Sequence, residues 1–284
     1  MPAIDWTSDL EIGISCVDGD HKVLVDLINQ VHDCSDQHEE SMILGSALSA
    51  LMEYTIYHFA REERLLELCG YAHLEAHKRA HADLAEKAQA FHQRYKDSDD
   101  GEVADEVKDF LRHWLVKHIM VQDFAFKETC SGNQTAIDEA AAMPFMNGMS
   151  VAQKPIDWSR LSVLLIDDNP NFRLLVKTIL KALGVRNFKQ APNGEKGLAM
   201  LAKKPVDVVM CDWVMDGMNG AEFARKLRQF DDTSPIVLVT GHLVEMYHDQ
   251  GAAAGVGGYL QKPITVRTLL EAIIQALNKP QRGV

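Results

Sequence analysis

The spacing of apolar residues divides this sequence into two parts that follow different periods. Up to about residue 130, apolar side chains recur at three- and four-residue intervals, the period of a helix with one buried face. This pattern predicts four helices, with approximate spans 19–37, 41–67, 71–96 and 102–128. Gly70 suits the end of the second helix, because glycine readily adopts the conformation that closes a helix. Four helices with short connections favour an all-α, up-and-down four-helix bundle.

After residue 160 the pattern changes to short apolar runs that alternate with amphipathic segments. The runs SVLLID, VDVVMC and PIVLVT are rich in β-branched residues and are typical of strands buried on both faces of a parallel sheet. The alternation predicts a doubly wound α/β fold with a five-stranded parallel sheet.

Between the two parts, residues 131–160 are small and polar, include two prolines and keep no sustained period. We predict a linker here, with one helical turn over 135–142. The predicted domains are therefore a helical domain over 1–130, a linker over 131–160 and an α/β domain over 161–284.

Composition and charge narrow the classes of function. The chain has 46% hydrophobic and 25% charged residues, which lets each part bury a core of its own. No apolar run approaches the roughly 20 residues that cross a bilayer, and the start MPAIDWTSDLEIGI lacks a signal-peptide pattern. We therefore expect a cytoplasmic protein with no membrane partner. Residues 1–130 carry 12 Lys and Arg against 26 Asp and Glu, which argues against nucleic acid as a partner. The five cysteines are odd in number and never spaced as CxxC, so we predict free thiols.

Histidines are concentrated in the first part, where residues 1–118 hold ten of the twelve. His58 precedes Glu62 by four residues and His77 precedes His81 by four, so each pair lies on one face of its helix. One such pair alone is more often solvated surface than a metal site. His21 adds weight, because it lies on the apolar stripe of the first helix, where a buried ring needs a partner.

The fourth predicted helix contributes His118 and Asp123, which are five residues apart. At about 100° per residue, these two side chains are roughly 140° out of register on a regular helix. Two explanations remain open. The carboxylate bridges two metals from the side of the helix, or a π-type bulge corrects the angle.

These residues give the first part its resemblance to bacterial hemerythrins, over essentially all of residues 1–130 from the IDW and IGISCVDGDH lead-in onward. The resemblance implies two iron ions joined by an oxo or hydroxo bridge. It implies that one ion is bound by His77, His81 and His118, the other by His21 and His58, and that Glu62 and Asp123 bridge them.

Imidazole and carboxylate ligands suit iron. The resemblance further implies that O2 binds at an open iron position, in an apolar pocket lined by Trp114, Leu115 and Ile119. Plain core packing would also explain these three residues. Nitric oxide and peroxide are the alternative ligands.

The second part places acidic residues after buried strands. Asp167 and Asp168 follow the first of these strands, and Asp212 ends another. A single aspartate here often only caps the next helix. Three carboxylates that meet at one edge of a parallel sheet need a cation, and oxygen ligands favour Mg²⁺.

With Thr240 after the fourth strand and Lys262 after the fifth, this part resembles response-regulator receiver domains over about residues 161–280, which implies a flavodoxin-like fold. The resemblance implies that Asp212 is the phosphoacceptor and binds Mg²⁺ together with Asp167 and Asp168. It also implies that Thr240 and Lys262 contact the phosphoryl oxygens and that Tyr259 is the aromatic switch.

One position departs from the receiver pattern, because Asp216 stands where the family commonly has proline. We hypothesise that this change alters Mg²⁺ affinity or the lifetime of the phosphoryl group.

Together the two resemblances predict a two-component signalling protein and not an enzyme. A diiron domain that senses O2 or redox state would be coupled to a receiver phosphorylated by a sensor histidine kinase or a phosphotransfer protein. We find no motif of a DNA-binding helix pair, a cyclase or a phosphodiesterase, so we expect output through a downstream protein partner. The alternatives are an oxygen-binding or delivery protein whose receiver only controls partner choice, and a diiron protein that reacts with peroxide or nitric oxide.

Overall fold

The computed structural model of the chain describes residues 2–34, 38–97, 101–145 and 156–278. Contacts within the chain form two compact units, one of Met1–Asp36 with Ala47–Gln153 and the other of Gln37–Ser46 with Lys154–Val284. The predicted domain boundaries at 130 and 160 stay predictions. None of the described helices is long and apolar enough to cross a membrane.

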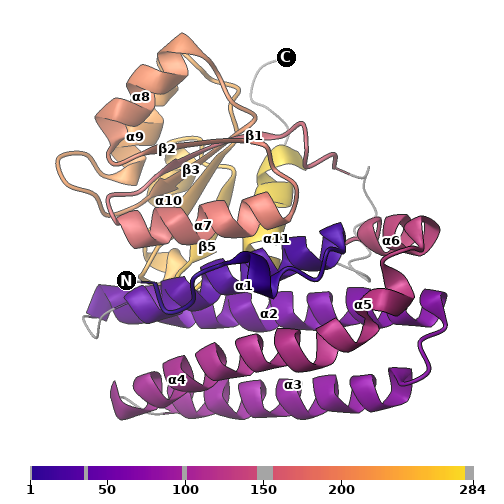
Figure 1. Cartoon of the computed structure of the whole chain (residues 1–284). Helices are drawn as coiled ribbons and strands as arrows, with labels where there is room; N and C mark the ends of the chain where they lie inside the picture. Colours follow the sequence, from indigo (N-terminus) through magenta and orange to yellow (C-terminus); the bar gives the residue numbers. More distant parts are fainter. Residues whose placement is uncertain (1, 35–37, 98–100, 146–155, 279–284) are drawn as a thin grey trace. The chain divides into compact units, whose positions relative to one another are not determined.

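The helical part contains the four predicted helices, running side by side in Figure 1. They are α1 (Ser15–Asp33), α2 (His38–Cys69), α3 (Leu74–Asp97) and α4 (Gly101–His118). Gly70 closes α2 as predicted, with a φ of 66° and with the Tyr71 amide donating to the Leu66 carbonyl oxygen at 3.0 Å. The predicted all-α bundle is confirmed.

The predicted start of the first helix, residue 19, is wrong by four residues. Gly13 has a φ of 83° and turns the chain, so that α1 begins at Ser15. Within its first turn, the Asp18 carboxylate accepts hydrogen bonds from the amides of Ile12 (2.8 Å) and Gly13 (2.9 Å). A negative charge in the first turn of a helix is stabilised by the helix dipole. The polar run DGDH, residues 18–21, therefore lies inside the helix.

The end of α4 changes its winding and leads into two short helices. A π-helix covers Ile119–Asp123, and α5 (Phe124–Cys130) follows directly. Asn133 then caps α6 (Gln134–Ala141), accepting a hydrogen bond from the Ala136 amide at 3.1 Å. The helical turn predicted over 135–142 is thus a helix of eight residues, and it packs against α1.

The second unit is a parallel sheet with helices on both faces. The strands are β1 (Ser162–Ile166), β2 (Asn187–Ala191), β3 (Val208–Asp212), β4 (Ile236–Thr240) and β5 (Gly258–Gln261). The helices are α7 (Pro170–Ala182), α8 (Gly194–Lys203), α9 (Gly220–Leu227), α10 (His248–Ala253) and α11 (Val266–Asn278). The strand order is β2-β1-β3-β4-β5 and every pair is parallel, so the predicted doubly wound fold is confirmed.

This topology determines where the functional groups of the sheet meet. In Figure 1, α7 and α11 cover one face and α8, α9 and α10 cover the other. The order reverses between β1 and β3, the point at which the carboxyl ends of doubly wound sheets bind ligands. β3 and β4 are buried throughout, which explains their uninterrupted apolar sequence.

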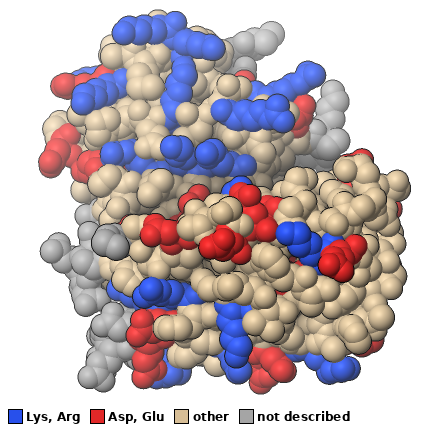
Figure 2. Space-filling view, viewed as in Figure 1, with Lys and Arg blue, Asp and Glu red and all other residues tan. Residues whose placement is uncertain are grey.

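The surface charge follows the sequence asymmetry. Residues 131–284 carry 17 Lys and Arg against 15 Asp and Glu, in contrast to the acidic first part. Over the second unit, the face drawn in Figure 2 shows mainly Lys and Arg, including the region of α8, where Lys196 and Lys203 are exposed.

Candidate metal centre and acidic site

The predicted iron ligands gather in the interior of the bundle. Two groups of side chains each bring their ligand atoms within 4.8 Å of one another. The first group consists of Glu62, His77, His81 and His118, and the second of His21, His58 and Glu62. Asp123 is buried between them, with no exposed surface.

Both carboxylates reach from one group to the other. Glu62 places Oε1 2.7 Å from His77 Nε2 and Oε2 3.1 Å from His58 Nε2. Asp123 places Oδ1 3.3 Å from His118 Nε2 and Oδ2 3.1 Å from His21 Nε2. Each carboxylate therefore lies where it can offer one oxygen to each of two ions.

The π-helix explains how Asp123 faces the same point as His118. On a regular α-helix the five-residue separation would turn the carboxylate away, whereas a π-turn closes between residues five apart. Of the two explanations that the sequence left open, the structure shows the π-type bulge, and it also shows the Asp123 carboxylate lying between the two groups of histidines.

The donor atoms of this centre fit a metal. Buried polar atoms normally have a hydrogen-bond partner, and each exception calls for an explanation. Among the described residues, buried nitrogen or oxygen atoms without such a partner occur in all seven predicted ligands: His21, His58, Glu62, His77, His81, His118 and Asp123. Metal ions between the two groups would satisfy these atoms, and imidazole with carboxylate suits iron.

The pKa values of the predicted ligands also favour cation binding inside the bundle. Burial lowers the pKa of His21, and it lowers the pKa of His118 to about 3, so both rings are in the neutral form that binds a metal. Burial and the neighbouring Glu62 raise the pKa of Asp123 well above its ordinary range. Burial opposes a charge on His58 too, but Asp20 and Glu62 outweigh it and raise the pKa of that ring to about 9. Metal binding at His58 therefore displaces a proton.

Three residues beside the ligands were not predicted from the sequence. Glu63 Oε1 lies 2.8 Å from His81 Nδ1, and Asp20 Oδ2 lies 3.5 Å from His58 Nδ1, so each carboxylate faces the ring nitrogen that is turned away from the centre. The Phe59 ring stacks on His81, with centroids 3.8 Å apart. Each of the three directly adjoins a predicted ligand in sequence. The ring that it contacts lies on another helix, which only the packing shows.

The predicted pocket residues lie in the core near these rings. Leu115 and Ile119 are fully buried and Trp114 is 8% exposed. The Trp114 ring lies 6.1 Å from the His118 ring and 6.2 Å from the Phe59 ring, and its Nε1 has no hydrogen-bond partner. Their role in binding O2 stays a prediction.

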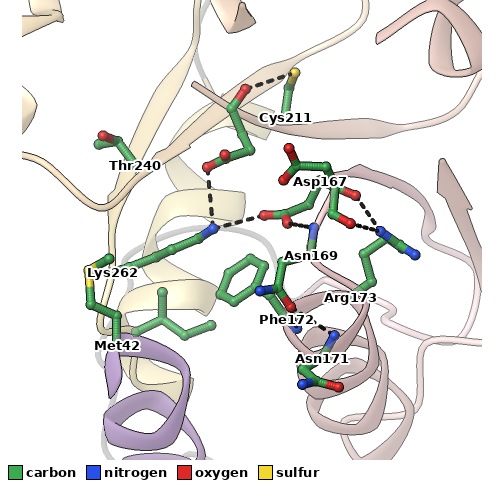
Figure 3. A network of polar contacts seen from close by, with 12 residues as sticks. Met42, Asp167, Asn169, Asn171, Phe172, Arg173, Cys211, Thr240 and Lys262 are labelled. Atoms are coloured by element: carbon green, nitrogen blue, oxygen red, sulfur yellow. Dashed lines mark hydrogen bonds and ion pairs between the residues drawn. The ribbon is translucent and has the colours of Figure 1, made fainter. Parts of the chain in front are cut away.

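At the carboxyl edge of the sheet, β1, β3 and β5 bring two acids and a lysine together (Figure 3). Lys262 Nζ lies 2.9 Å from Asp167 Oδ2 and 3.3 Å from Asp212 Oδ1, and all three side chains are buried. The ammonium also lies 4.0 Å from the centroid of the Phe172 ring, a contact that the sequence did not predict.

The pKa values at this edge of the sheet indicate that the site would accommodate a further positive charge. Burial raises the pKa of Asp212 to about 7, against the effect of Lys262 and with the help of Asp167. Burial also raises the pKa of Asp167. Burial would lower the pKa of Lys262, but the two carboxylates outweigh it and raise that pKa. A divalent cation fits this site because it would stabilise both carboxylates in their ionised form.

The other predicted residues of this edge differ in position. Thr240 is buried beside the site, and its Oγ1 accepts a hydrogen bond from the His242 amide at 3.0 Å. Asp168 and Asp216 are exposed. Tyr259 is half-buried, and its hydroxyl donates to the His248 carbonyl oxygen at 2.9 Å.

Arg173, on α7, was not predicted from the sequence. Its Nη1 donates to the carbonyl oxygens of Asp167 (2.6 Å) and Asp168 (2.9 Å), and so holds the acidic loop in place (Figure 3).

Comparison with known proteins gives a separate result for each part. The family model described as the hemerythrin HHE cation binding domain matches residues 13–130, and the response regulator receiver domain matches residues 163–274. A bacteriohemerythrin of Pseudomonas aeruginosa (strain LESB58) is 35% identical over 126 residues, which cover 44% of this chain and 80% of that protein. Chemotaxis protein CheY-3 of Vibrio cholerae is 34% identical over 115 residues, which cover 40% of this chain and 88% of that protein.

Solved structures resemble each part separately. A hemerythrin mutant is 28% identical with a TM-score of 0.43, and the match covers 46% of this chain and 99% of that one. Chemotaxis response regulator CheY4 of Vibrio cholerae is 30% identical with a TM-score of 0.38, and the match covers 41% of this chain and 98% of that one. The two family matches and the two relatives show that the chain belongs to both the bacteriohemerythrin family and the CheY-like response-regulator receiver family, one in each part.

Proposed function

We propose that the protein is a two-component signalling protein whose non-haem diiron domain responds to O2 or redox state and is coupled to a receiver phosphorylated on Asp212. Membership of the hemerythrin family supports iron binding, and membership of the receiver family supports a kinase or another signalling partner. The observation that carries the diiron assignment is the pair of carboxylates, Glu62 and Asp123, that spans two groups of unpartnered histidine nitrogens.

In the bundle, His77, His81 and His118 would hold one iron and His21 and His58 the other. When bound, the two irons supply a reversible change of oxidation state and an affinity for O2. The chain contributes fixed ligand positions, and the apolar side chains of Leu115 and Ile119 exclude water from this interior.

In the receiver, the Asp212 carboxylate oxygen attacks the phosphorus of a phosphodonor, such as a phosphohistidine, and the bond from phosphorus to the donor breaks. Asp167, Asp168 and Asp212 would hold Mg²⁺, which offsets the charge of the phosphoryl group. Lys262, 3.3 Å from Asp212, and the buried Thr240 would bind the phosphoryl oxygens, and this pre-positioned charge would lower the barrier to transfer. We assign no enzymatic activity beyond this self-phosphorylation.

The test is phosphotransfer to the full-length protein in four defined states: ferrous without air, oxygenated, ferric and metal-free. Acetyl phosphate and a sensor histidine kinase serve as donors, and Asp212→Asn is the unreactive control. We expect the rate to differ between ferrous and ferric protein by about fivefold or more, the lower end of coupling between sites. Equal rates and equal partner affinity in all four states would overturn the coupling and favour the oxygen-binding alternative.

Iron content and the absorption spectrum are measured on the same samples. Two irons per chain with a reversible spectral change in air support O2 as the ligand. Steady turnover of peroxide or nitric oxide would instead favour the reactive-protein alternative.

A further inference from the structure

A short segment after α6 lies against two tyrosines of α2. The Tyr57 hydroxyl donates to the Met143 carbonyl oxygen at 3.0 Å, and the Phe145 ring centroid is 4.7 Å from that of Tyr57. Phe145 also stacks on Tyr54, with centroids 5.7 Å apart and an interplanar angle of 25°. We call Met143–Phe145 the docked segment. It leads toward the second unit in sequence and is held by side chains of the iron-binding unit.

The two tyrosines are tied to one buried carboxylate. The Tyr54 hydroxyl donates to Asp20 Oδ1 at 2.7 Å, and Arg61 Nη1 donates to the same oxygen at 2.9 Å. The Arg61 guanidinium lies 4.4 Å from the centroid of the Tyr57 ring, and the rings of Tyr54 and Tyr57 meet edge to face. Asp20 is 2% exposed. Moving this carboxylate therefore moves the groups that hold the docked segment.

The same carboxylate faces a predicted iron ligand. Asp20 Oδ2 lies 3.5 Å from His58 Nδ1, and neither atom has a hydrogen-bond partner. This distance is at the outer limit of a hydrogen bond, whereas the contacts of Asp20 with Tyr54 and Arg61 are short. The carboxylate is therefore shared unequally, and the contact with His58 has room to tighten.

We propose that Asp20 is a positioning residue that couples His58 to the docked segment through Tyr54, so that Met143–Phe145 loosens when the iron centre is oxidised. This inference rests on the proposed function. When His58 Nε2 binds a metal, Nδ1 carries the proton and donates toward Asp20. More positive charge at Nε2 makes that N–H a stronger donor, which draws Asp20 toward His58 and away from Tyr54. Tyr54 then holds the Phe145 ring less firmly.

Limited digestion of the full-length protein by chymotrypsin tests this, because the enzyme cuts after exposed phenylalanine. The rate of the cut after Phe145 is followed by mass spectrometry in ferrous and ferric protein. We expect ferric protein to be cut about fivefold faster, a typical lower value for coupled sites. Equal rates in the wild-type protein, including no cut in either state, would overturn the proposal.

The decisive variant is Tyr54→Phe, which keeps the ring on Phe145 and removes only the hydroxyl that reaches Asp20. We expect this variant to be cut at the same rate in both iron states, while its iron content and absorption spectrum match the wild type. Tyr71→Phe is the matched control, since the Tyr71 ring contacts His73 and Phe126. It should keep the wild-type difference. A Tyr54→Phe protein that still shows the full difference would contradict the role of Asp20.

Phosphotransfer measured on the same samples separates this inference from the proposed function. If phosphotransfer depends on iron state but digestion after Phe145 does not, or does so equally in Tyr54→Phe, the route through Asp20 fails and the proposed function stands. If digestion responds to iron state through Tyr54 but phosphotransfer never does, the route stands and the proposed coupling fails.

Discussion

Single carboxylates in this chain differ in chemistry because their neighbours differ. Glu62 and Asp123 are surrounded by imidazole nitrogens, and Asp212 shares a lysine with Asp167. Glu63 instead lies 2.8 Å from Nδ1 of His81, the ring nitrogen that is turned away from the centre. Residues that differ in this way respond differently to the loss of one charge.

Replacing Glu63 with glutamine should weaken iron binding without unfolding the bundle. The amide still reaches His81 Nδ1 but no longer fixes the ring by a charged hydrogen bond, so we expect about a tenfold loss of iron affinity. Competition with a coloured chelator measures this loss. Glu67→Gln is the matched control, because Glu67 is exposed and pairs with Arg64. An affinity unchanged in Glu63→Gln would show that the contact does not orient His81.

The raised pKa of Asp212 predicts a pH-dependent effect of Mg²⁺ on stability. The folded protein keeps a proton on Asp212 up to about pH 7, whereas the unfolded chain loses it near the ordinary value of 3.8. This group therefore stabilises the fold at low pH, and that contribution is lost as pH rises through 7. Mg²⁺ binds the ionised carboxylate, so excess Mg²⁺ should raise the receiver melting temperature more at about pH 8 than at about pH 5.5.

Calorimetry of the full-length protein checks this prediction. The Asp212→Asn variant cannot ionise at this position, so its receiver transition should depend less on pH and gain little from Mg²⁺. A wild-type Mg²⁺ effect of equal size at both pH values would contradict the assignment.

Among the secondary-structure elements, the π-helix Ile119–Asp123 has the most direct effect on the candidate metal centre. It contains one more residue than a regular turn between His118 and Asp123. Its residues Met120 and Val121 are exposed, at 53% and 61%, so a substitution of either removes no buried side chain. The number of residues in this turn, and not their identity, sets the direction of the Asp123 carboxylate.

Deletion and insertion at Val121 should therefore have opposite outcomes. Deleting Val121 converts the turn to an α-helix in which His118 and the aspartate are four apart and about 40° from alignment, so we expect most iron to be retained. Inserting one alanine after Val121 turns the carboxylate by about a further 100°, so we expect iron to be lost. Iron per chain and helical circular dichroism measure both. Equal iron content in the two variants would refute this account.

The extent of sequence prediction also differs between elements. Periodicity predicted the four bundle helices and the parallel strands because each has one or two faces buried along its whole length. It misplaced the start of α1, because that start is determined by a turn at Gly13 and by the Asp18 carboxylate. The spacing of apolar residues contains no signal for either feature. Periodicity did not decide whether a π-helix forms at Ile119–Asp123. An extra residue in a helical turn can be recognised only from how the neighbouring side chains pack.

The site shows the same limit. The spacing of His58, Glu62, His77 and His81 indicated a shared face, and the family resemblance supplied the pairing between helices. Contacts such as that of Phe59 with His81 join residues on different helices. They follow from tertiary packing, so no local pattern in one sequence predicts them.

At the scale of the whole molecule, the two units have separate cores and separate charged centres. A compact unit with its own core usually unfolds on its own. Stability measured by heating should therefore report on the two centres separately.

Removing iron should lower one melting transition and leave the other in place. The bundle would then hold unpaired buried carboxylates and imidazoles, so we expect its melting temperature to fall by about 10 °C or more. Calorimetry before and after chelation under reducing conditions measures this, with readdition of Fe²⁺ as the control. Of the two metals, only Mg²⁺ should shift the receiver transition. A uniform shift of both transitions on chelation would contradict this separation.

The two carboxylates that span the histidine groups also bear on how the bundle fills with metal. An ion in either group would fix one oxygen of Glu62 and one of Asp123, and would thereby place the second oxygen of each carboxylate for a second ion. The first binding event thus lowers the entropic cost of the second, which is positive cooperativity. At limiting iron, the population should consist of empty chains and chains with two ions, and singly loaded chains should be scarce.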